Sequence, residues 1–326
     1  MGFGLESYVF YPPIGVIISL LMIFGLDALG LLVFRFLALD LTNKKDFWLR
    51  YQSPLIGTSV IISIYSPIVL AGFFISVVPT VFGSILVLLG LNHLVVNFSR
   101  LYSKVKFKII EFKLIDWSLI SILFGFGLLA MAPITCADSL DYHVGTAISI
   151  LNSGSFPFQP EWFHSRLIGS GEILIAMGLS LGAEQFSSLL QFLGLTSMVL
   201  IFLTKTGTFG GEKKWIVLAI ISSPVLLGMI SSAKPFLLPC SMTTSALMII
   251  NFNLVSGSFK KNSQYARKSF FLVLLLAITA ATMKANFLLS GAIVVGLALL
   301  VQIKTKSWKF ELGLGSLTFL VILFPF

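Results

Sequence analysis

The sequence has few charged residues for its length, and this scarcity excludes a soluble globular protein. Asp, Glu, Lys and Arg make up 11% of the 326 residues, whereas hydrophobic residues make up 57%. A soluble domain carries about 25% charged residues, so this chain cannot cover a surface that faces water. We therefore interpret it as an integral membrane protein that contacts the lipid bilayer.

Cysteine is also scarce. The two cysteines, Cys136 and Cys240, are too few for a disulfide scaffold or a cysteine-built metal site, and the sequence does not decide whether they pair. Residues 1–11 contain no Lys or Arg and so lack the basic segment of a secretory signal peptide. The first apolar run, residues 14–37, is therefore interpreted as a retained membrane span.

Apolar runs continue along the whole chain. A helix needs about 20 residues to cross the hydrocarbon core of a bilayer. Hydropathy predicts spans at residues 13–35, 54–73, 76–97, 115–135, 184–204, 215–233, 238–257, 270–284, 287–303 and 311–326. The 270–284 and 287–303 spans are short and meet near Lys284, which indicates a broken helix pair. One more stretch, residues 167–181, is apolar but short and contains Glu172.

The positions of the basic residues decide whether residues 167–181 cross the membrane. Of the 22 Lys and Arg residues, 19 lie in the loops 35–50, 100–113, 205–214, 260–268 and 304–309. Cytoplasmic loops are rich in Lys and Arg, and all five loops share one side only if residues 167–181 do not cross. We therefore expect a re-entrant or surface-lying helix on the outer face. The net charge of +9 then orients the helices and does not indicate nucleic-acid binding.

These observations predict an all-α, polytopic transmembrane bundle of about ten spans with the N-terminus outside. Residues 1–100 form an N-terminal three-helix block, and residues 115–326 form the core. Surface helices are expected in the long outer loop 136–184. Because an apolar run reaches Phe326, we expect that the core is truncated at its C-terminus.

The outer side holds the remaining basic residues and most of the reactive side chains. Arg166, Lys234 and Lys284 are the cations outside the five basic loops. Two of the three histidines, His143 and His164, also lie on this side in the predicted topology. A charged residue at or near membrane depth is costly, and it is a functional candidate by default.

The loop opens with Cys136-Ala-Asp-Ser-Leu-Asp-Tyr-His143. If this stretch is helical, Asp138 and Asp141 share a face, with Tyr142 next to them. Residues 142–151 then place apolar side chains on one side, as in a short helix on the membrane surface. The turn residues Asn152-Ser-Gly-Ser155 are expected to end it.

This order of features resembles the first half of a GT-C glycosyltransferase, the multi-helix class that includes protein mannosyltransferases and lipid A aminoarabinose transferases. The resemblance covers roughly residues 115–326 and rests on Asp138 at the outer boundary, Tyr142 four residues later and the Ser/Gly turn. Many members carry a second acid directly after the first, but Ser139 stands there. Asp141 is the substitute that we consider, and this departure leaves a two-carboxylate role open.

The resemblance implies transfer of a sugar from a polyprenyl-phosphate carrier to a glycan, lipid or protein acceptor on the outer face of a bacterial plasma membrane. Asp138 would act as the base that accepts the proton of the attacking hydroxyl, with Asp141 as a second catalytic candidate. The substrate-binding candidates are Tyr142 and His143 beside that acid and the carrier-phosphate partners Lys234, Lys284 and Arg166. The sequence does not decide whether a divalent metal takes part, and we predict no metal ligands.

Two other functions remain open at this point. A transporter or flippase for lipid-linked substrates would favour charges in the middle of the membrane and inverted repeats, and Asp27 is the one charge that fits. A polysaccharide polymerase or ligase would share the outer-face chemistry. Asp27 either pairs with a polar residue on a neighbouring helix or takes part in proton movement.

Overall fold

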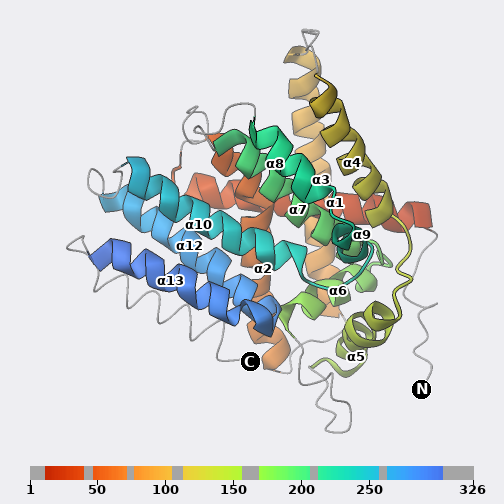
Figure 1. Cartoon of the computed structure of the whole chain (residues 1–326). Helices are drawn as coiled ribbons and strands as arrows, with labels where there is room; N and C mark the ends of the chain where they lie inside the picture. Colours follow the sequence, from red (N-terminus) through yellow and green to blue (C-terminus); the bar gives the residue numbers. More distant parts are fainter. Residues whose placement is uncertain are drawn as a thin grey trace.

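The computed structural model describes residues 12–39, 47–71, 77–104, 113–155, 169–205, 212–256 and 263–303, and in this part of the chain it is all-helical (Figure 1). Five helices are long and apolar enough to cross a membrane, with limits Pro12–Phe36, Trp48–Val69, Val77–Asn97, Phe186–Thr204 and Gln264–Met283. Further apolar helices of 10–17 residues accompany them. The described chain is therefore an all-α bundle in which several helices have the length and composition of membrane spans.

The N-terminal part contains α1 (Pro12–Phe36), the short helix η2 (Phe47–Gln52), α2 (Ser53–Leu70) and α3 (Val77–Lys104). Helix α1 packs against both α2 and α3, and glycines allow the backbones to touch. A Cβ atom added to Gly30 would lie 1.7 Å from the Ser53 carbonyl oxygen, and one added to Gly90 would lie 1.9 Å from that of Leu21. Small residues at helix crossings are typical of membrane proteins, where close backbone contact replaces the hydrophobic effect.

The remaining chain continues through α4 (Leu114–Ala130), η3 (Ser139–Val144), α5 (Gly145–Ser153), α6 (Ser170–Ser180) and α7 (Phe186–Lys205). Then come α8 (Glu212–Ile221), α9 (Val225–Ile230), α10 (Leu237–Ser256), α12 (Ser263–Met283), η5 (Ala285–Phe287) and α13 (Leu288–Ile303). Helices α10, α12 and α13 lie side by side as one layer, and α5, α6 and α9 gather near one end of it (Figure 1).

Two predicted spans differ from the observed helices. The predicted span 215–233 is divided into α8 and α9 at Ser222–Pro224, because proline lacks the N–H that an uninterrupted helix needs. Helix α12 is longer than predicted, since it already begins at Ser263. The break at Lys284 is confirmed, because this residue has the extended backbone angles φ −159° and ψ 131°.

The sequence predicts a re-entrant or surface-lying helix at residues 167–181, and the burial of α6 inside the bundle agrees with the re-entrant alternative. Most residues of α5 are buried as well. Ten of the eleven residues of α6 are buried, as expected for a helix that is apolar on every side. Helix α6 rises about 16 Å, well short of a bilayer core, so it does not cross. Helix α5 ends at the predicted turn, with Gly154 at φ 72° in the left-handed conformation, and Gly182 at φ 69° follows α6 in the same way.

An ion pair places two of the basic loops at the same end of the bundle. Lys214 Nζ lies 2.5 Å from Asp116 Oδ1, and these residues stand at the starts of α8 and α4. Each start directly follows one of the basic segments, 205–214 and 100–113. The ion pair therefore agrees with the expectation that residues 167–181 do not reverse the topology.

Candidate functional site

The turn after α4 is fixed by a carboxylate from a distant part of the chain. The backbone N–H of Ile134 donates a hydrogen bond to Glu184 Oε1 over 2.9 Å, and Glu184 is 9% exposed. Glu184 stands just before α7. Its side chain ties the start of the predicted loop 136–184 to the end of the same loop, and this holds the entry to Asp138 in place.

Asp138 precedes η3, which is a π-helix. A π-helix closes its hydrogen bonds from residue i to i+5 and has a wider turn than an α-helix. Asp138 and Asp141 are both exposed, whereas Tyr142 and His143 are buried. Tyr142 lies close enough to Asp138 for the charge of this acid to act on its hydroxyl, but it does not share the exposed face of the two acids that α-helical spacing predicted. The wide turn instead directs Tyr142 and His143 inward.

His143 forms a buried pair with Glu172 of α6, which we name the histidine pair. His143 Nδ1 lies 2.6 Å from Glu172 Oε1, and both side chains are 1% exposed. The other carboxylate oxygen, Oε2, accepts the Gly169 N–H over 2.9 Å and so caps α6. The Tyr142 ring lies 4.1 Å from the His143 ring. Burial, together with the charges of Glu172 and Asp138, raises the pKa of the Tyr142 hydroxyl.

The start of α6 is packed against the end of α12. Ser170 Oγ and Thr282 Oγ1 are 2.9 Å apart, and a Cβ atom added to Gly169 would lie 2.3 Å from the Met283 carbonyl oxygen. Only glycine fits so close to another backbone. This contact brings Lys284, the residue after Met283, to the end of the bundle that holds the histidine pair.

Two lysines and one aspartate meet at this end, and we name Asp138, Lys234, Lys284 and Phe236 the lysine cluster. Lys234 Nζ forms an ion pair with Asp138 Oδ2, and the side chains are 28% and 52% exposed respectively. Lys284 Nζ lies over the Phe236 ring, 3.5 Å from its centroid. Burial lowers the pKa of Lys284, and the nearby Lys234 adds to this, while the charges of Glu172 and Asp138 oppose it.

The position of Phe236 is fixed by a glutamine from α7. Gln191 Oε1 accepts hydrogen bonds from the backbone N–H groups of Phe236, Leu237 and Leu238 at 3.0, 2.9 and 3.3 Å. The first N–H groups of a helix lack partners within the helix, so Gln191 caps α10 from outside. Lys234 precedes this cap by two residues and is held near Asp138. The sequence contains no local signal for this contact.

The structure therefore brings together three of the predicted site residues, Asp138, Lys234 and Lys284. Tyr142 and His143 lie behind them in the interior, and Asp141 is exposed and forms no ion pair with the described cations. Arg166 and His164 lie outside the described residues. Cys136 and Cys240 are free thiols. The described residues contain no cluster of three or more His, Cys, Asp or Glu side chains that could hold a metal ion.

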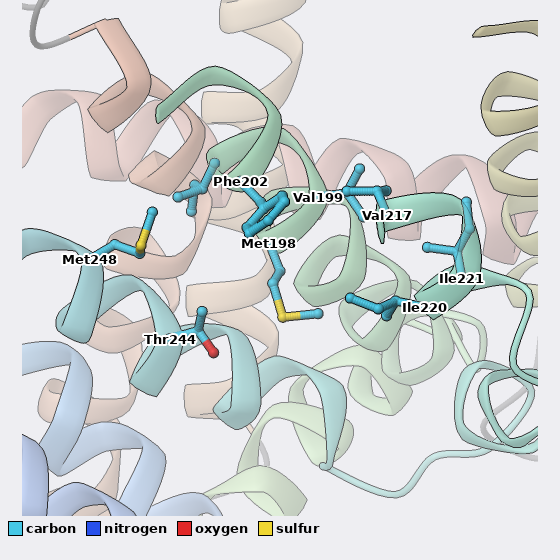
Figure 2. A pocket seen from close by; sticks show the side chains of 9 residues that line it. Met198, Val199, Phe202, Val217, Ile220, Ile221, Thr244 and Met248 are labelled. Atoms are coloured by element: carbon cyan, nitrogen blue, oxygen red, sulfur yellow. The ribbon is translucent and has the colours of Figure 1, made fainter. Parts of the chain in front are cut away.

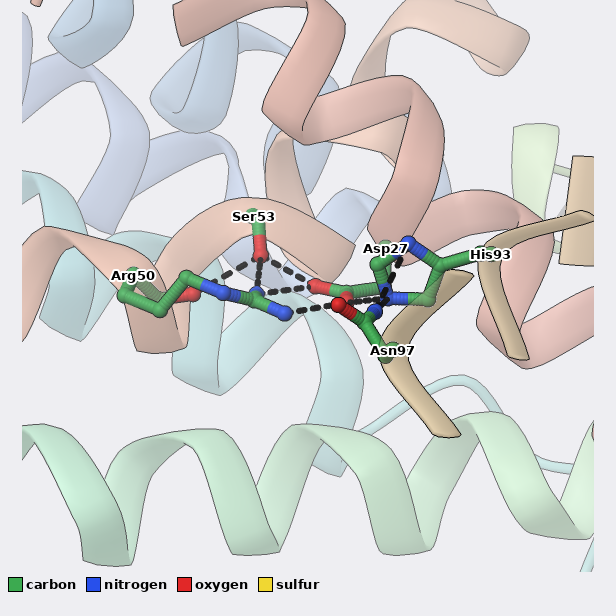
Figure 3. Close-up of polar contacts among 5 residues, drawn as sticks. All are labelled: Asp27, Arg50, Ser53, His93 and Asn97. Carbon is green, nitrogen blue, oxygen red and sulfur yellow. Dashed lines mark hydrogen bonds and ion pairs between the residues drawn. The ribbon is translucent and has the colours of Figure 1, made fainter. Parts of the chain in front are cut away.

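A second polar cluster lies in the N-terminal part, and we name Asp27, Arg50, Ser53, His93 and Asn97 the arginine cluster (Figure 3). Arg50 binds both Asp27 carboxylate oxygens, at 2.5 and 2.6 Å. Ser53 donates to Oδ1, and His93 Nε2 lies 3.0 Å from Oδ2. Asp27 thus pairs with polar residues of neighbouring helices, which was the first of the two roles considered for it.

An apolar pocket of about 220 Å³ lies between α7, α8 and α10. Figure 2 shows Met198, Phe202, Ile220 and Met248 around it, with Thr244 as the polar residue of the lining. A pocket without a charged group offers no acid, base or anion site. Its lining suits hydrocarbon.

Comparison with protein-family models shows which family the chain belongs to. The family model for the DUF1420 N-terminal domain matches residues 1–102 and 96–326. The chain belongs to the DUF1420 family. The two matched segments of this DUF1420 protein meet at the end of α3, close to the domain boundary predicted from the sequence. No curated protein and no solved structure matches the chain.

Proposed function

We propose that this DUF1420 protein is a membrane glycosyltransferase of the GT-C type. It would move a sugar from a polyprenyl-phosphate carrier to a glycan, lipid or protein acceptor during assembly of the cell envelope. The observation that carries this proposal is the lysine cluster, in which one carboxylate and two ammonium groups from distant parts of the chain meet. These are the groups that such a transfer needs at one place.

In the proposed reaction Asp138 accepts the proton of the acceptor hydroxyl while that oxygen attacks the anomeric carbon of the sugar. The bond between the sugar and the phosphate oxygen breaks, and its electrons remain on the phosphate. Lys234 and Lys284 stabilise the charge that develops on this leaving group, because electrostatic stabilisation of developing charge is strong in a partly desolvated site. General-base assistance of this kind contributes roughly 10²–10⁴-fold to a rate.

The topology that goes with this function has about ten spans, with the N-terminus and the lysine cluster on the outer face of a bacterial plasma membrane. The five long helices and the shorter apolar helices support such a bundle. The Asp116–Lys214 ion pair supports a common side for two of the basic loops. Carrier lipids enter such a site from the bilayer, and the apolar pocket between α7, α8 and α10 is suited to hydrocarbon.

The transporter hypothesis is weaker than the enzyme hypothesis. It depended on Asp27 as a charge in the middle of the membrane. Both carboxylate oxygens of Asp27 are engaged by Arg50 and His93 in the arginine cluster. A carboxylate that takes up and releases an ion or a proton needs an accessible oxygen atom. In Asp27 both oxygen atoms are already bound by other side chains.

The test is sugar transfer by the purified chain in proteoliposomes that contain polyprenyl-phosphate hexoses and pentoses. The released polyprenyl phosphate is the measured product. This product is common to all donors of the class. We expect Asp138→Asn to lower the rate about 100-fold or more, because it removes the base. The control is Asp116→Asn, which removes an aspartate that is also paired with a lysine, at the other end of α4. Full activity of Asp138→Asn in correctly inserted protein would show that the proposal is wrong.

A further inference from the structure

The lysine cluster has an unequal balance of charge. Lys234 and Lys284 supply two ammonium groups, and Asp138 supplies the carboxylate that pairs with the first. Glu172 is near enough to affect the pKa of Lys284, but its two oxygens are already engaged by His143 and the Gly169 N–H. Within the described ranges no carboxylate lies at ion-pair distance from Lys284. The cluster therefore has one ammonium group more than it has exchangeable carboxylates.

The contact between Asp138 and Lys234 is open to water. Asp138 is 52% exposed and Lys234 is 28% exposed, and ion pairs with this degree of exposure are weak, since water and salt compete with them. Lys284 differs, because it is half buried and lies over the Phe236 ring. An anion that reaches both ammonium groups gains one strong partner in Lys284 and loses little by displacing a carboxylate from Lys234.

We propose that Asp138 occupies part of a phosphate site in the free protein, and that the carrier phosphate displaces it from Lys234. This inference rests on the proposed function for the class of its ligand, a polyprenyl phosphate. The same lysine cannot pair fully with the carboxylate and with the phosphate. Binding of the phosphate thus breaks the contact between Asp138 and Lys234, and the Asp138 carboxylate then becomes the better proton acceptor.

The displacement links two steps of the proposed reaction. While the site is empty, the ion pair with Lys234 makes Asp138 a weaker base, because a neighbouring cation favours the ionised carboxylate. When the phosphate holds Lys234, the carboxylate loses that partner and becomes more basic. After transfer, the return of Asp138 to Lys234 competes with the phosphate product and favours its departure. Asp138 acts in both steps through one contact.

The inference predicts opposite effects of one substitution on binding and on transfer. Asp138→Asn removes the competitor of the phosphate and should tighten binding, although it abolishes transfer. An exposed ion pair is worth up to about 1 kcal/mol, which corresponds to about fivefold in a dissociation constant. A simple positioning or folding role of Asp138 would instead weaken binding or leave it unchanged.

The experiment measures binding of farnesyl monophosphate to the full chain in detergent micelles by titration calorimetry, with farnesol as the uncharged probe. We expect Asp138→Asn and Asp138→Ser to bind the phosphate about fivefold more tightly than the wild type. The control Asp116→Asn should leave the affinity unchanged, and Lys284→Gln should weaken it about tenfold or more. Farnesol should bind equally to all variants, so that a change in hydrocarbon binding is detected separately.

Each result has a defined meaning. Equal or weaker phosphate binding by both Asp138 variants overturns the displacement, even if transfer is lost as expected. Tighter binding together with full transfer supports the displacement and overturns the role of Asp138 as the base. Equal affinity of the wild type for farnesol and its phosphate shows that the lysine cluster is not a phosphate site, and it overturns this inference.

Discussion

The lysine cluster and the arginine cluster both hold an aspartate against a basic side chain, but they use their polar groups differently. In the arginine cluster both oxygens of Asp27 are bound, and Asp27 and His93 are 14% and 13% exposed, whereas Arg50 is 31% exposed. In the lysine cluster Asp138 is 52% exposed, and Lys284 lies over a ring and forms no ion pair with the described carboxylates. The arginine cluster joins α1, η2, α2 and α3. In the lysine cluster, the Lys284 ammonium group can still bind an anion.

This difference agrees with a structural role of the arginine cluster and with the role in binding that we propose for the lysine cluster. The ion pair between Asp27 and Arg50 is partly buried, which costs free energy of desolvation, and the hydrogen bonds to both carboxylate oxygens offset that cost. A partly buried ammonium group without a carboxylate partner is destabilising, and proteins keep such groups where they serve binding or catalysis. Substitutions in the two clusters should therefore have opposite effects on stability.

The largest effect on stability is expected for Asp27→Ala. This substitution leaves Arg50 and His93 without their carboxylate, and it should lower the free energy of unfolding by about 3 kcal/mol, since removal of one partner strands the other charge. Reversible unfolding in mixed detergent micelles measures this change. A double variant, Asp27→Ala with Arg50→Met, should recover part of the loss. If Asp27→Ala is as stable as the wild type, the structural role of the arginine cluster is excluded.

The opposite sign is expected for Lys284→Met. Removal of the half-buried charge should raise the free energy of unfolding by roughly 1 kcal/mol and weaken phosphate binding about tenfold or more. The pKa of Lys284 is lowered by folding, so the cost of its burial is present at neutral pH. The cost disappears as the pH rises through the folded pKa towards the usual lysine value. The gain in stability should therefore be larger at pH 7 than at pH 10.

The matched control for this substitution is Lys284→Arg, which keeps the positive charge. Its stability should not rise at either pH. A loss of stability in Lys284→Met at pH 7 would place Lys284 among the structural residues and would remove the contrast between the two clusters.

The smallest effect is expected for Lys234→Gln. Its ion pair with Asp138 is exposed to water, so its loss should change the free energy of unfolding by less than about 1 kcal/mol. Unfolding in the same micelles, at low and at high salt, measures this. A loss as large as that of Asp27→Ala would show that the lysine cluster also holds the fold together.

Much of the fold could be predicted from hydropathy and charge, because spans need apolar length and basic loops share a side. The helix break at Lys284 and the turns at Gly154 and Gly182 carry local signals. Burial of α6 was less predictable, since it depends on neighbours far along the chain. Glu172 did carry a local sign, as an acid three residues after Gly169 can cap a helix.

The candidate site was predictable in composition but not in geometry. The residues Asp138, Lys234 and Lys284 could be selected because they are charged residues away from the basic loops. Their contact depends on the cap that Gln191 provides to α10. It also depends on the fit of Gly169 against Met283. The π-helix that turns Tyr142 and His143 inward has no sequence motif, so the position of these two residues could not be predicted.

The glycine contacts of α1 also bear on the order in which the protein assembles. Gly25 and Gly90 join α1 to α3, and Gly30 and Gly57 join it to α2. The arginine cluster lies within the same consecutive stretch, from Asp27 to Asn97. None of these contacts needs a residue beyond α3. The first three long helices can thus pack against one another during synthesis, before the later part of the chain is made. The later helices, which position the lysine cluster, then pack against this assembled unit.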